Sequence, residues 1–219
     1  MEIPAWHRYF PQLTEDQNHK LNQLPGLVLE WNQRINLISR KDEDRVAIHH
    51  VLHSLAPAKV LTFPKGSRVL DIGTGGGFPA IPLAILFPDV EWVAVDSIGK
   101  KINVVKDLAQ QLQLNNLEAI HQRAEDVKGP FDFVVSRAVA RMASLVQWTK
   151  PVLARNRKGD TPNGWVVLKG GDPDAGLKEE LEEAGLPYKL FPVSMYFEEP
   201  YFDQKFVVYM TPTPFPSAS

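Results

Sequence analysis

The chain has 219 residues, of which 44% are hydrophobic and 23% are charged, with a formal net charge of -2 and no cysteine. These values are typical of a soluble globular protein, with room for one domain of ordinary size and an appendage. They exclude disulfides, thiolate metal sites and a cysteine nucleophile. No apolar run is long enough to cross a membrane and the first residues do not resemble a signal peptide, so we expect a cytoplasmic protein without a membrane partner.

The first 60 residues are expected to form a helical extension. Thr14, followed three residues later by Gln17, fits a capping box at a helix start. Apolar residues then recur at three- and four-residue spacing, as on one helix face: Leu21, Leu24, Val28, Trp31 and Ile35. The pair Pro25-Gly26 predicts a break or kink in this helix. A second helix is predicted at about 42–55.

Between residues 61 and 210, apolar runs alternate with helical stretches. The strand candidates in this part are SRVLDIG, EWVAVDS, LEAIHQR, FDFVVSRAV and GWVVLKG. They lack strict polar alternation, as expected of parallel strands that are covered on both faces. Near the end, KLFPVSM and KFVVYM have no helix between them and predict an antiparallel pair at one edge. The pattern therefore predicts an α/β fold with a seven-stranded mixed sheet, followed by a disordered tail at 211–219.

The stretch VLDIGTGGGFPAIPLAI lies where ligands bind in such sheets, at the loop after the first strand. A dinucleotide fingerprint needs glycines at the first, third and sixth positions, but Phe78 occupies the sixth. The stretch fits a second pattern, apolar-apolar-Asp-x-Gly-x-Gly-x-Gly, which is the first motif of class I methyltransferases with a Rossmann-like fold. Its fixed positions are Asp71, Gly73, Gly75 and Gly77. This motif predicts a site for S-adenosylmethionine (SAM).

Two further positions support this cofactor. Asp96 ends the second strand candidate, nineteen residues after Gly77 and just before Ser97, where a carboxylate can accept hydrogen bonds from both ribose hydroxyls. Ala124 and Glu125 follow the third strand candidate, at the usual position of the adenine, and Glu125 could accept its exocyclic amine. The carboxylates would also offset the positive charge of the sulfonium.

Absent motifs limit the methyl acceptor. Without a cysteine, methylation at carbon 5 of pyrimidines is improbable. Exocyclic amines usually require an Asn/Asp-Pro-Pro-aromatic motif after the fourth strand, where this chain has Ser136-Arg137-Ala138-Val139. Nitrogen 7 of guanine fits what remains, because it has a lone pair and no proton, so alignment can replace a general base. A hydroxyl or a protein side chain stays open as the acceptor, and no catalytic residue is identified.

These motifs resemble those of the bacterial small-subunit rRNA guanine-N7 methyltransferases, the glucose-inhibited division protein B (RsmG) family. The resemblance covers about residues 20–210 and depends on WNQRINLIS, HHVLHSL, the glycine stretch, VDSIGKKINVV, RAED, FDFVVSRAVA and LKGG. It implies methyl transfer from SAM to guanine 527 in the decoding-region loop of 16S rRNA, leaving S-adenosylhomocysteine. The implied partner is naked 16S rRNA or the small ribosomal subunit, and no metal is implied. The implied cofactor contacts are Gly73, Phe78, Ala124, Glu125 and Arg137.

The chain departs from this family at two positions. The family usually has aspartate where this chain has His53, and often glycine where it has Ala80. His49, His50 and His53 do not form a recognisable zinc motif. We expect them to lie on a polar helix face at the mouth of the cofactor site, with contact to the RNA backbone as an alternative.

Several basic and aromatic residues have two interpretations each. Arg137 follows a buried strand and is expected to pair with the methionine carboxylate or a phosphate, or else to form a structural salt bridge. Lys169 could bind the same kind of anion. Phe78 could cover the cofactor or belong to the core. Arg34 and Asn36 are candidates for RNA contact.

Charge is distributed unevenly along the sequence. Seven basic residues lie at 137–169 against one acid, and nine acids lie at 170–203 against two lysines. This polarity fits a basic face for an anionic partner, but charge alone favours two ordinary solvated surfaces. We expect the helical extension and the basic segment to form an rRNA surface on a monomer. Two other functions stay open, a methyltransferase for a small molecule or protein and a non-catalytic RNA-binding module.

Overall fold

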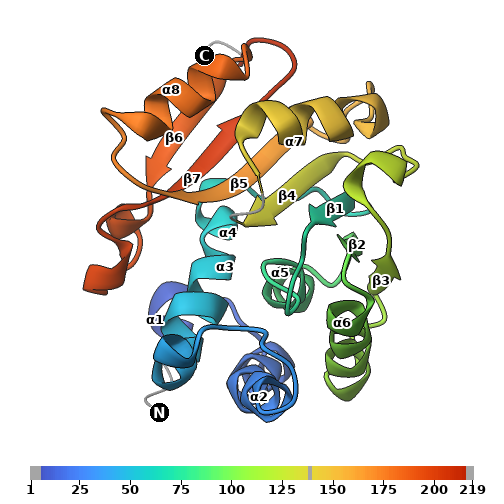
Figure 1. The fold of residues 1–219 in the computed structure, drawn as a ribbon, viewed down its shortest axis with the longest axis vertical. Helices are drawn as coiled ribbons and strands as arrows, with labels where there is room; N and C mark the ends of the chain where they lie inside the picture. Colours follow the sequence, from blue (N-terminus) through green and yellow to red (C-terminus); the bar gives the residue numbers. More distant parts are fainter. Residues whose placement is uncertain (1–5, 138–139, 216–219) are drawn as a thin grey trace.

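A seven-stranded mixed sheet forms the centre of the protein in the computed structural model, which describes residues 6–137 and 140–215 (Figure 1). Its strand order is β3-β2-β1-β4-β5-β7-β6. The strands are β1 (Arg68–Ile72), β2 (Glu91–Asp96), β3 (Leu117–His121), β4 (Phe133–Arg137), β5 (Gly164–Gly170), β6 (Tyr188–Pro192) and β7 (Lys205–Met210). The first five are parallel, and β7 runs antiparallel between β5 and β6. The predicted sheet and its antiparallel pair are confirmed.

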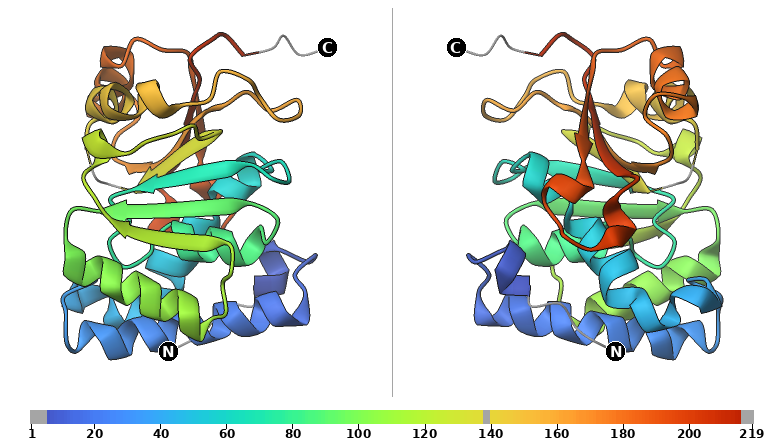
Figure 2. Two further views of the ribbon diagram at one scale, coloured as in Figure 1. Left: turned by 90° about the vertical axis from the view of Figure 1, so that its right-hand side faces the viewer. Right: turned by 90° about the vertical axis from the view of Figure 1, so that its left-hand side faces the viewer.

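Helices cover both faces of this sheet. They are α1 (Trp6–Tyr9), α2 (Glu15–Asn32), α3 (His53–Leu55), α4 (Pro57–Val60), α5 (Ala80–Leu86), α6 (Gly99–Gln111), α7 (Met142–Thr149) and α8 (Gly176–Glu183). Figure 2 shows α7 and α8 on one side of the sheet and the helices from α1 to α6 on the other. One apolar core lies in each interface, which explains why the central strands are apolar along their whole length.

Helix α2 begins as the sequence predicts but does not break. The Thr14 hydroxyl accepts a hydrogen bond from Gln17 N (3.2 Å) and the Gln17 side chain accepts one from Thr14 N (3.0 Å), which completes the capping box. The helix then continues through Pro25. Of the predicted break or kink, the break is therefore wrong. Pro25 removes one helical hydrogen bond, at a cost of about 3 kcal/mol, but burial of the flanking Leu24 and Val28 in the core offsets it.

The segment after α2 is helical but is not the regular helix expected at 42–55. It consists of the 3₁₀ turns of η1 (Arg40–Arg45), the wider π-helical turns of η2 (Ala47–Leu52) and the short helices α3 and α4. The π turns leave the backbone carbonyl of His49 available to partners outside the helix, namely Arg137 Nη1 and the Tyr201 hydroxyl, both at 3.4 Å. Such π turns are frequent near functional sites.

The expected tail falls partly on residues 216–219, which lie outside the described residues. At its start, Thr211 is buried and its N–H donates to the Pro187 carbonyl (3.0 Å). The ring of Phe215 packs edge-on against Tyr209, with 5.3 Å between centroids. Within the described ranges, no helix has both the length and the apolarity that a membrane crossing requires.

Candidate functional site

The glycine loop after β1 is tied to the neighbouring strand and to itself. The N–H groups of Gly73 and Thr74 both donate to the Val95 carbonyl in β2 (2.8 and 3.0 Å). The Thr74 carbonyl then accepts from the N–H groups of Gly77 and Phe78 (both 2.9 Å). The loop is thus a fixed turn that ends just before α5.

Glycine is required in this turn for a steric reason. Gly73, Gly75 and Gly77 have φ angles of +66°, +59° and +92°, in the region that other residues rarely adopt. At Gly77 an added Cβ would in addition overlap the side chain of Ile81. All three glycines are therefore required for the backbone conformation of the turn, and Gly77 is also required for packing against Ile81.

Asp96, the last residue of β2, holds the glycine loop and the start of α6 together. Its Oδ2 accepts a hydrogen bond from Gly75 N (3.0 Å) and its Oδ1 accepts one from Ile98 N (2.8 Å). The residue is 7% exposed. Each carboxylate oxygen has about two acceptor positions, so one per oxygen remains for a ligand hydroxyl.

A cavity of about 310 Å³ lies beside this carboxylate, at the carboxyl ends of β1, β2 and β3. Five of the predicted cofactor residues line it: Gly73, Asp96, Ser97, Ala124 and Glu125. Its volume lies at the lower end of the range of small-molecule sites, which is roughly 300–1,000 Å³. The structure thus brings the ribose and adenine candidates together in one pocket.

The same pocket contains two residues that the motifs do not indicate, Trp148 of α7 and Gln122. Lys101 and Arg123, which lie within VDSIGKKINVV and RAED, also line it. Trp148 is partly exposed and lies beside the buried Leu145 and Thr149 of its helix. The sequence signal for Trp148 was its position at the border of a buried helix face. This signal does not show which pocket the side chain lines, because the other lining residues come from distant parts of the sequence.

Asp71 lies beneath the loop and does not line the pocket. It is fully buried in β1, and its Oδ2 accepts a hydrogen bond from Ala80 N (3.1 Å) at the start of α5. Burial raises the pKa of its carboxyl to about 7, against the opposing effects of the Thr74 side chain, the Ala80 hydrogen bond and the Arg137 charge. In this position Asp71 supports the start of α5.

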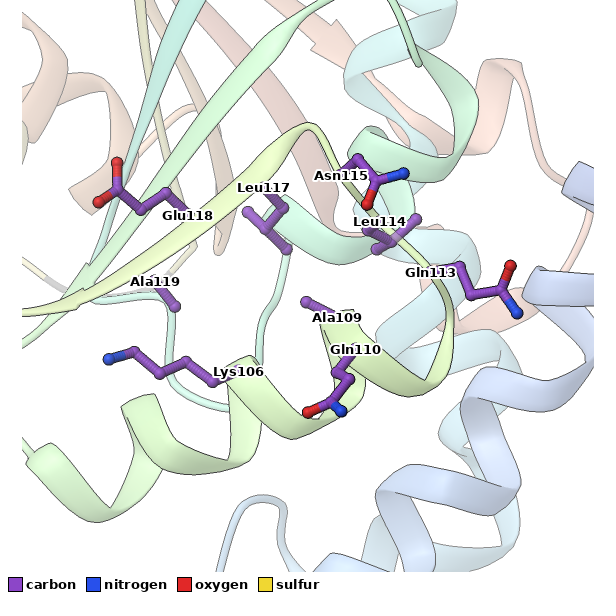
Figure 3. Close-up of a pocket in the computed structure, with 9 residues that line it drawn as sticks. All are labelled: Lys106, Ala109, Gln110, Gln113, Leu114, Asn115, Leu117, Glu118 and Ala119. Carbon is purple, nitrogen blue, oxygen red and sulfur yellow. The ribbon is translucent and has the colours of Figure 1, made fainter.

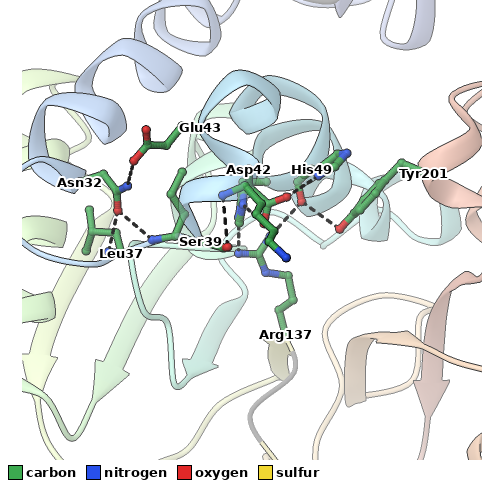
Figure 4. Close-up of polar contacts among 11 residues, drawn as sticks. Asn32, Leu37, Ser39, Asp42, Glu43, His49, Arg137 and Tyr201 are labelled. Carbon is green, nitrogen blue, oxygen red and sulfur yellow. Dashed lines mark hydrogen bonds and ion pairs between the residues drawn. The ribbon is translucent and has the colours of Figure 1, made fainter.

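Phe78 and Arg137 form a second group on the side of the loop that faces the helical extension. The guanidinium carbon of Arg137 lies 5.1 Å from the centroid of the Phe78 ring, which is 2% exposed. Arg137 Nη2 lies 3.0 Å from His50 Nδ1. Figure 4 shows the side chain of Arg137 extending towards the helical segment that carries Asp42 and His49. In the described part of the chain no carboxylate lies within ion-pair distance of Arg137. The salt-bridge alternative is therefore wrong for these residues.

The histidines are held by aromatic and acidic neighbours. His49 Nδ1 lies 2.8 Å from Asp42 Oδ1, and the His49 ring stacks on Tyr201 with 3.7 Å between centroids. Burial and the Arg137 charge lower the pKa of His50 to about 4. Burial also lowers the pKa of His53 well below its ordinary value. Among the described residues, no three acidic or histidine side chains are grouped so as to hold a metal ion.

The basic and acidic segments of the sequence pair with each other at helix α8. Lys169 Nζ lies 2.6 Å from Glu180 Oε1 and donates to the Ala140 carbonyl (2.7 Å). Arg141 Nη2 lies 2.6 Å from Glu183 Oε2. Lys169 is therefore occupied by a structural ion pair, which corrects its interpretation as an anion-binding residue.

A larger cavity, of about 570 Å³, lies between α6 and the edge strand β3 (Figure 3). Its walls include Lys106, Gln110 and Glu118, and none of the predicted site residues. It lies away from the glycine loop, so the smaller pocket remains the candidate site.

Comparisons with known proteins agree with this geometry. Two solved structures share the fold: a SAM-dependent methyltransferase from Aquifex aeolicus (20% identity, TM-score 0.54, 73% of this chain and 92% of that one) and magnesium protoporphyrin IX methyltransferase from Synechocystis (13%, 0.57, 91% and 99%). The class I methyltransferase fold is thereby confirmed.

Closer relatives exist among curated proteins. Ribosomal RNA small subunit methyltransferase G from Christiangramia forsetii is 46% identical over 210 residues, covering 96% of this chain and 97% of the relative. The protein of the same name from Bacteroides thetaiotaomicron is 47% identical over 206 residues, covering 92% and 96%. The family model GidB, described as rRNA small subunit methyltransferase G, matches residues 17–189. The chain therefore belongs to the GidB family of rRNA small subunit methyltransferases.

Proposed function

We propose that this protein transfers a methyl group from SAM to N7 of guanine 527 in 16S rRNA. The observation that carries the proposal is the pocket in which Gly73, Asp96 and Glu125 meet, in a chain that belongs to an rRNA methyltransferase family. The family supports the substrate class, and the pocket supports the donor.

The residues around the pocket fit the donor chemically. The two acceptor positions left on the Asp96 carboxylate match two ribose hydroxyls, and Glu125 lies in the same pocket as an acceptor for an exocyclic amine. Arg137 lies on the other side of the glycine loop and has no carboxylate partner among the described residues, so it can receive the amino-acid carboxylate. When bound, SAM supplies an electrophilic methyl group on a positively charged sulfur.

His50 and His53, which lie near Arg137, are weak bases because their pKa values are lowered. The lowered pKa values keep His50 and His53 uncharged, and burial keeps them within the helical segment. This suits an acceptor nitrogen that has a lone pair and loses no proton. The protein then acts by holding both reactants in line, an effect that supplies up to roughly 7–11 kcal/mol.

The proposal is tested by methyl transfer to 16S rRNA that lacks the modification, with SAM labelled on its methyl group. We expect label in the RNA, recovered as 7-methylguanosine by mass spectrometry, and chain cleavage at guanine 527 after borohydride and aniline treatment. Asp96→Ala should abolish most of the transfer, whereas Glu118→Gln, on the exposed face of β3, should not.

Other outcomes would favour the two alternatives. Label that stays in a protein or small-molecule fraction would indicate a different acceptor. RNA binding by the wild-type protein without any transfer to naked rRNA or to small subunits would indicate a non-catalytic RNA-binding module. We also propose that the protein acts as a monomer, which sedimentation equilibrium can test.

A further inference from the structure

The seven basic residues of the segment 137–169 divide into two sets in the structure. Four of them have a side-chain partner within the protein: Arg137 with His50, Arg141 with Glu183, Lys158 with Asp132 (3.2 Å) and Lys169 with Glu180. The other three are Lys150, Arg155 and Arg157. All three are exposed, and none lies within ion-pair distance of a carboxylate in the part of the chain that the structure describes.

These three cations line one groove. The groove has a volume of about 860 Å³ and runs between η4 (Lys150–Val152) with the loop that follows it and the segment 212–214 after β7. Its other walls are proline, leucine, alanine, threonine and asparagine residues, and among the described residues no acidic side chain lines it. The nearest acid in sequence, Asp160, meets Arg157 through its backbone carbonyl (3.4 Å). The groove therefore carries three positive charges that no lining side chain neutralises.

The groove lies at the end of the sheet opposite to the cofactor pocket. It adjoins the residues that precede β5, whereas the pocket adjoins the residues that follow β1, β2 and β3. Figure 2 shows the yellow-orange loop between α7 and β5 projecting at the end away from the strand tips. The two sites approach each other along α7 and η4, because Trp148 lines the pocket and Lys150, two residues later, lines the groove.

We propose that this groove, lined by Lys150, Arg155 and Arg157, binds the phosphate backbone of the RNA substrate outside the methyl-transfer site. The inference rests on the proposed function and extends it with a second contact surface. Phosphate is the anion that fits, because arginine presents a fork of donors to its oxygens and neutralised phosphates release their counterions.

The groove extends the contact with the substrate beyond the target base. Lys150 lies two residues from Trp148 of the pocket, whereas Arg155 and Arg157 lie further along the chain, in the loop before β5. A folded rRNA domain, or the assembled small subunit, can place one phosphate strand in the groove while the target base reaches the pocket. The groove thus contributes to the affinity for the RNA and to its orientation, and the pocket holds the methyl donor.

The test compares two charge-matched triple variants. Lys150→Gln/Arg155→Gln/Arg157→Gln removes the groove cations. Lys65→Gln/Lys106→Gln/Lys178→Gln removes three exposed cations from the turn before β1, from α6 and from α8, which do not line the groove. Filter binding of each protein to a full-length 16S rRNA transcript is measured between about 50 and 200 mM salt, the range over which phosphate contacts dominate.

The groove variant should bind the transcript about 10- to 100-fold more weakly at low salt. The negative slope of log K against log salt should become less steep, by about 2 to 3. The control variant should retain the wild-type slope. Binding of S-adenosylhomocysteine, measured by calorimetry, should be the same in all three proteins, because none of the substituted residues lines the pocket.

Two results would overturn the inference. One is a groove variant with the same affinity and salt slope as the control. The other is a groove variant that binds the transcript more weakly but keeps the wild-type salt slope, since the loss of phosphate contacts must reduce that slope. Failure of the wild-type protein to bind either RNA or S-adenosylhomocysteine would instead reject the proposed function, and the groove inference with it.

Discussion

The carboxylate of Asp96 accepts a hydrogen bond from the backbone N–H of Gly75 at 3.0 Å, and this contact joins the end of β2 to the glycine loop after β1. A second hydrogen bond, from Ile98 N, joins the same carboxylate to the start of α6. The carboxylate that is expected to accept hydrogen bonds from the ribose is thus already oriented by two backbone N–H groups. Its geometry does not have to be created when a ligand binds, which lowers the cost of binding.

Replacing Asp96 by asparagine should weaken the binding of S-adenosylhomocysteine by roughly 10- to 150-fold, because hydrogen bonds to a charged acceptor contribute about 1.5–3 kcal/mol. The side-chain NH₂ of the asparagine would also face the N–H of Gly75 or Ile98, so that two donors would oppose each other. Calorimetry measures the affinity, and thermal unfolding shows whether the variant is folded. A folded Asp96→Asn protein with wild-type affinity would refute the role of this carboxylate.

The two levels of constraint at Gly77 can be separated by a matched pair of substitutions. Gly66→Ala, at φ +73° with no atom within 4 Å of the added Cβ, should cost only the backbone strain of about 1–2 kcal/mol. Gly77→Ala should cost at least about 1 kcal/mol more, because its Cβ overlaps Ile81. Urea unfolding measures both. Equal losses of stability would mean that packing against Ile81 does not constrain the loop.

Much of the fold follows from local sequence signals. The apolar runs predict every strand, because strands covered on both faces need no alternation, and Thr14 with Gln17 predicts the start of α2 through a contact three residues apart. Pro25 misleads because its cost is local, whereas the burial that offsets it comes from α5 and α6. The predicted pocket residues meet because strand ends of a parallel sheet share one edge.

The parts that could not be predicted depend on distant partners. Lys169 has the same local pattern as an anion-binding lysine, and only the position of Glu180 on α8 shows that it is paired. Phe78 follows β1 and Arg137 is the last residue of β4, and the two come together with His50 through the irregular turns of η2. Trp148 carries no motif, and its place in the pocket depends on the packing of α7.

Trp148 should contribute to the affinity for the cofactor. The side chain lines the pocket, so Trp148→Ala removes an aromatic wall and should weaken S-adenosylhomocysteine binding by roughly 3- to 10-fold. Trp148→Phe should keep most of the affinity. Gln147→Ala, an exposed neighbour on α7, serves as the control for helix stability. Calorimetric affinities that are equal in all three variants would exclude a contact between Trp148 and the ligand.

Stability should depend on pH through His50. The unfolded chain protonates this residue near pH 6.5, but the folded protein does so only near pH 4, because burial and then Arg137 lower its pKa. The unfolded state therefore binds more protons between these values, and stability falls as the pH decreases through this window, by up to about 1.4 kcal/mol per pH unit. The difference in unfolding free energy between wild type and His50→Gln isolates this term. Parallel stability curves from pH 4 to 7 would contradict the assignment.

The most direct test of the central claim is a calorimetric titration of the wild-type protein with S-adenosylhomocysteine. It should be done at two temperatures, because a binding enthalpy can pass through zero at one of them but not at both when the heat capacity changes. The account predicts saturable binding with one site per chain. The absence of heat at both temperatures, from a protein shown to be folded, would contradict the cofactor site and the methyltransferase mechanism derived from it.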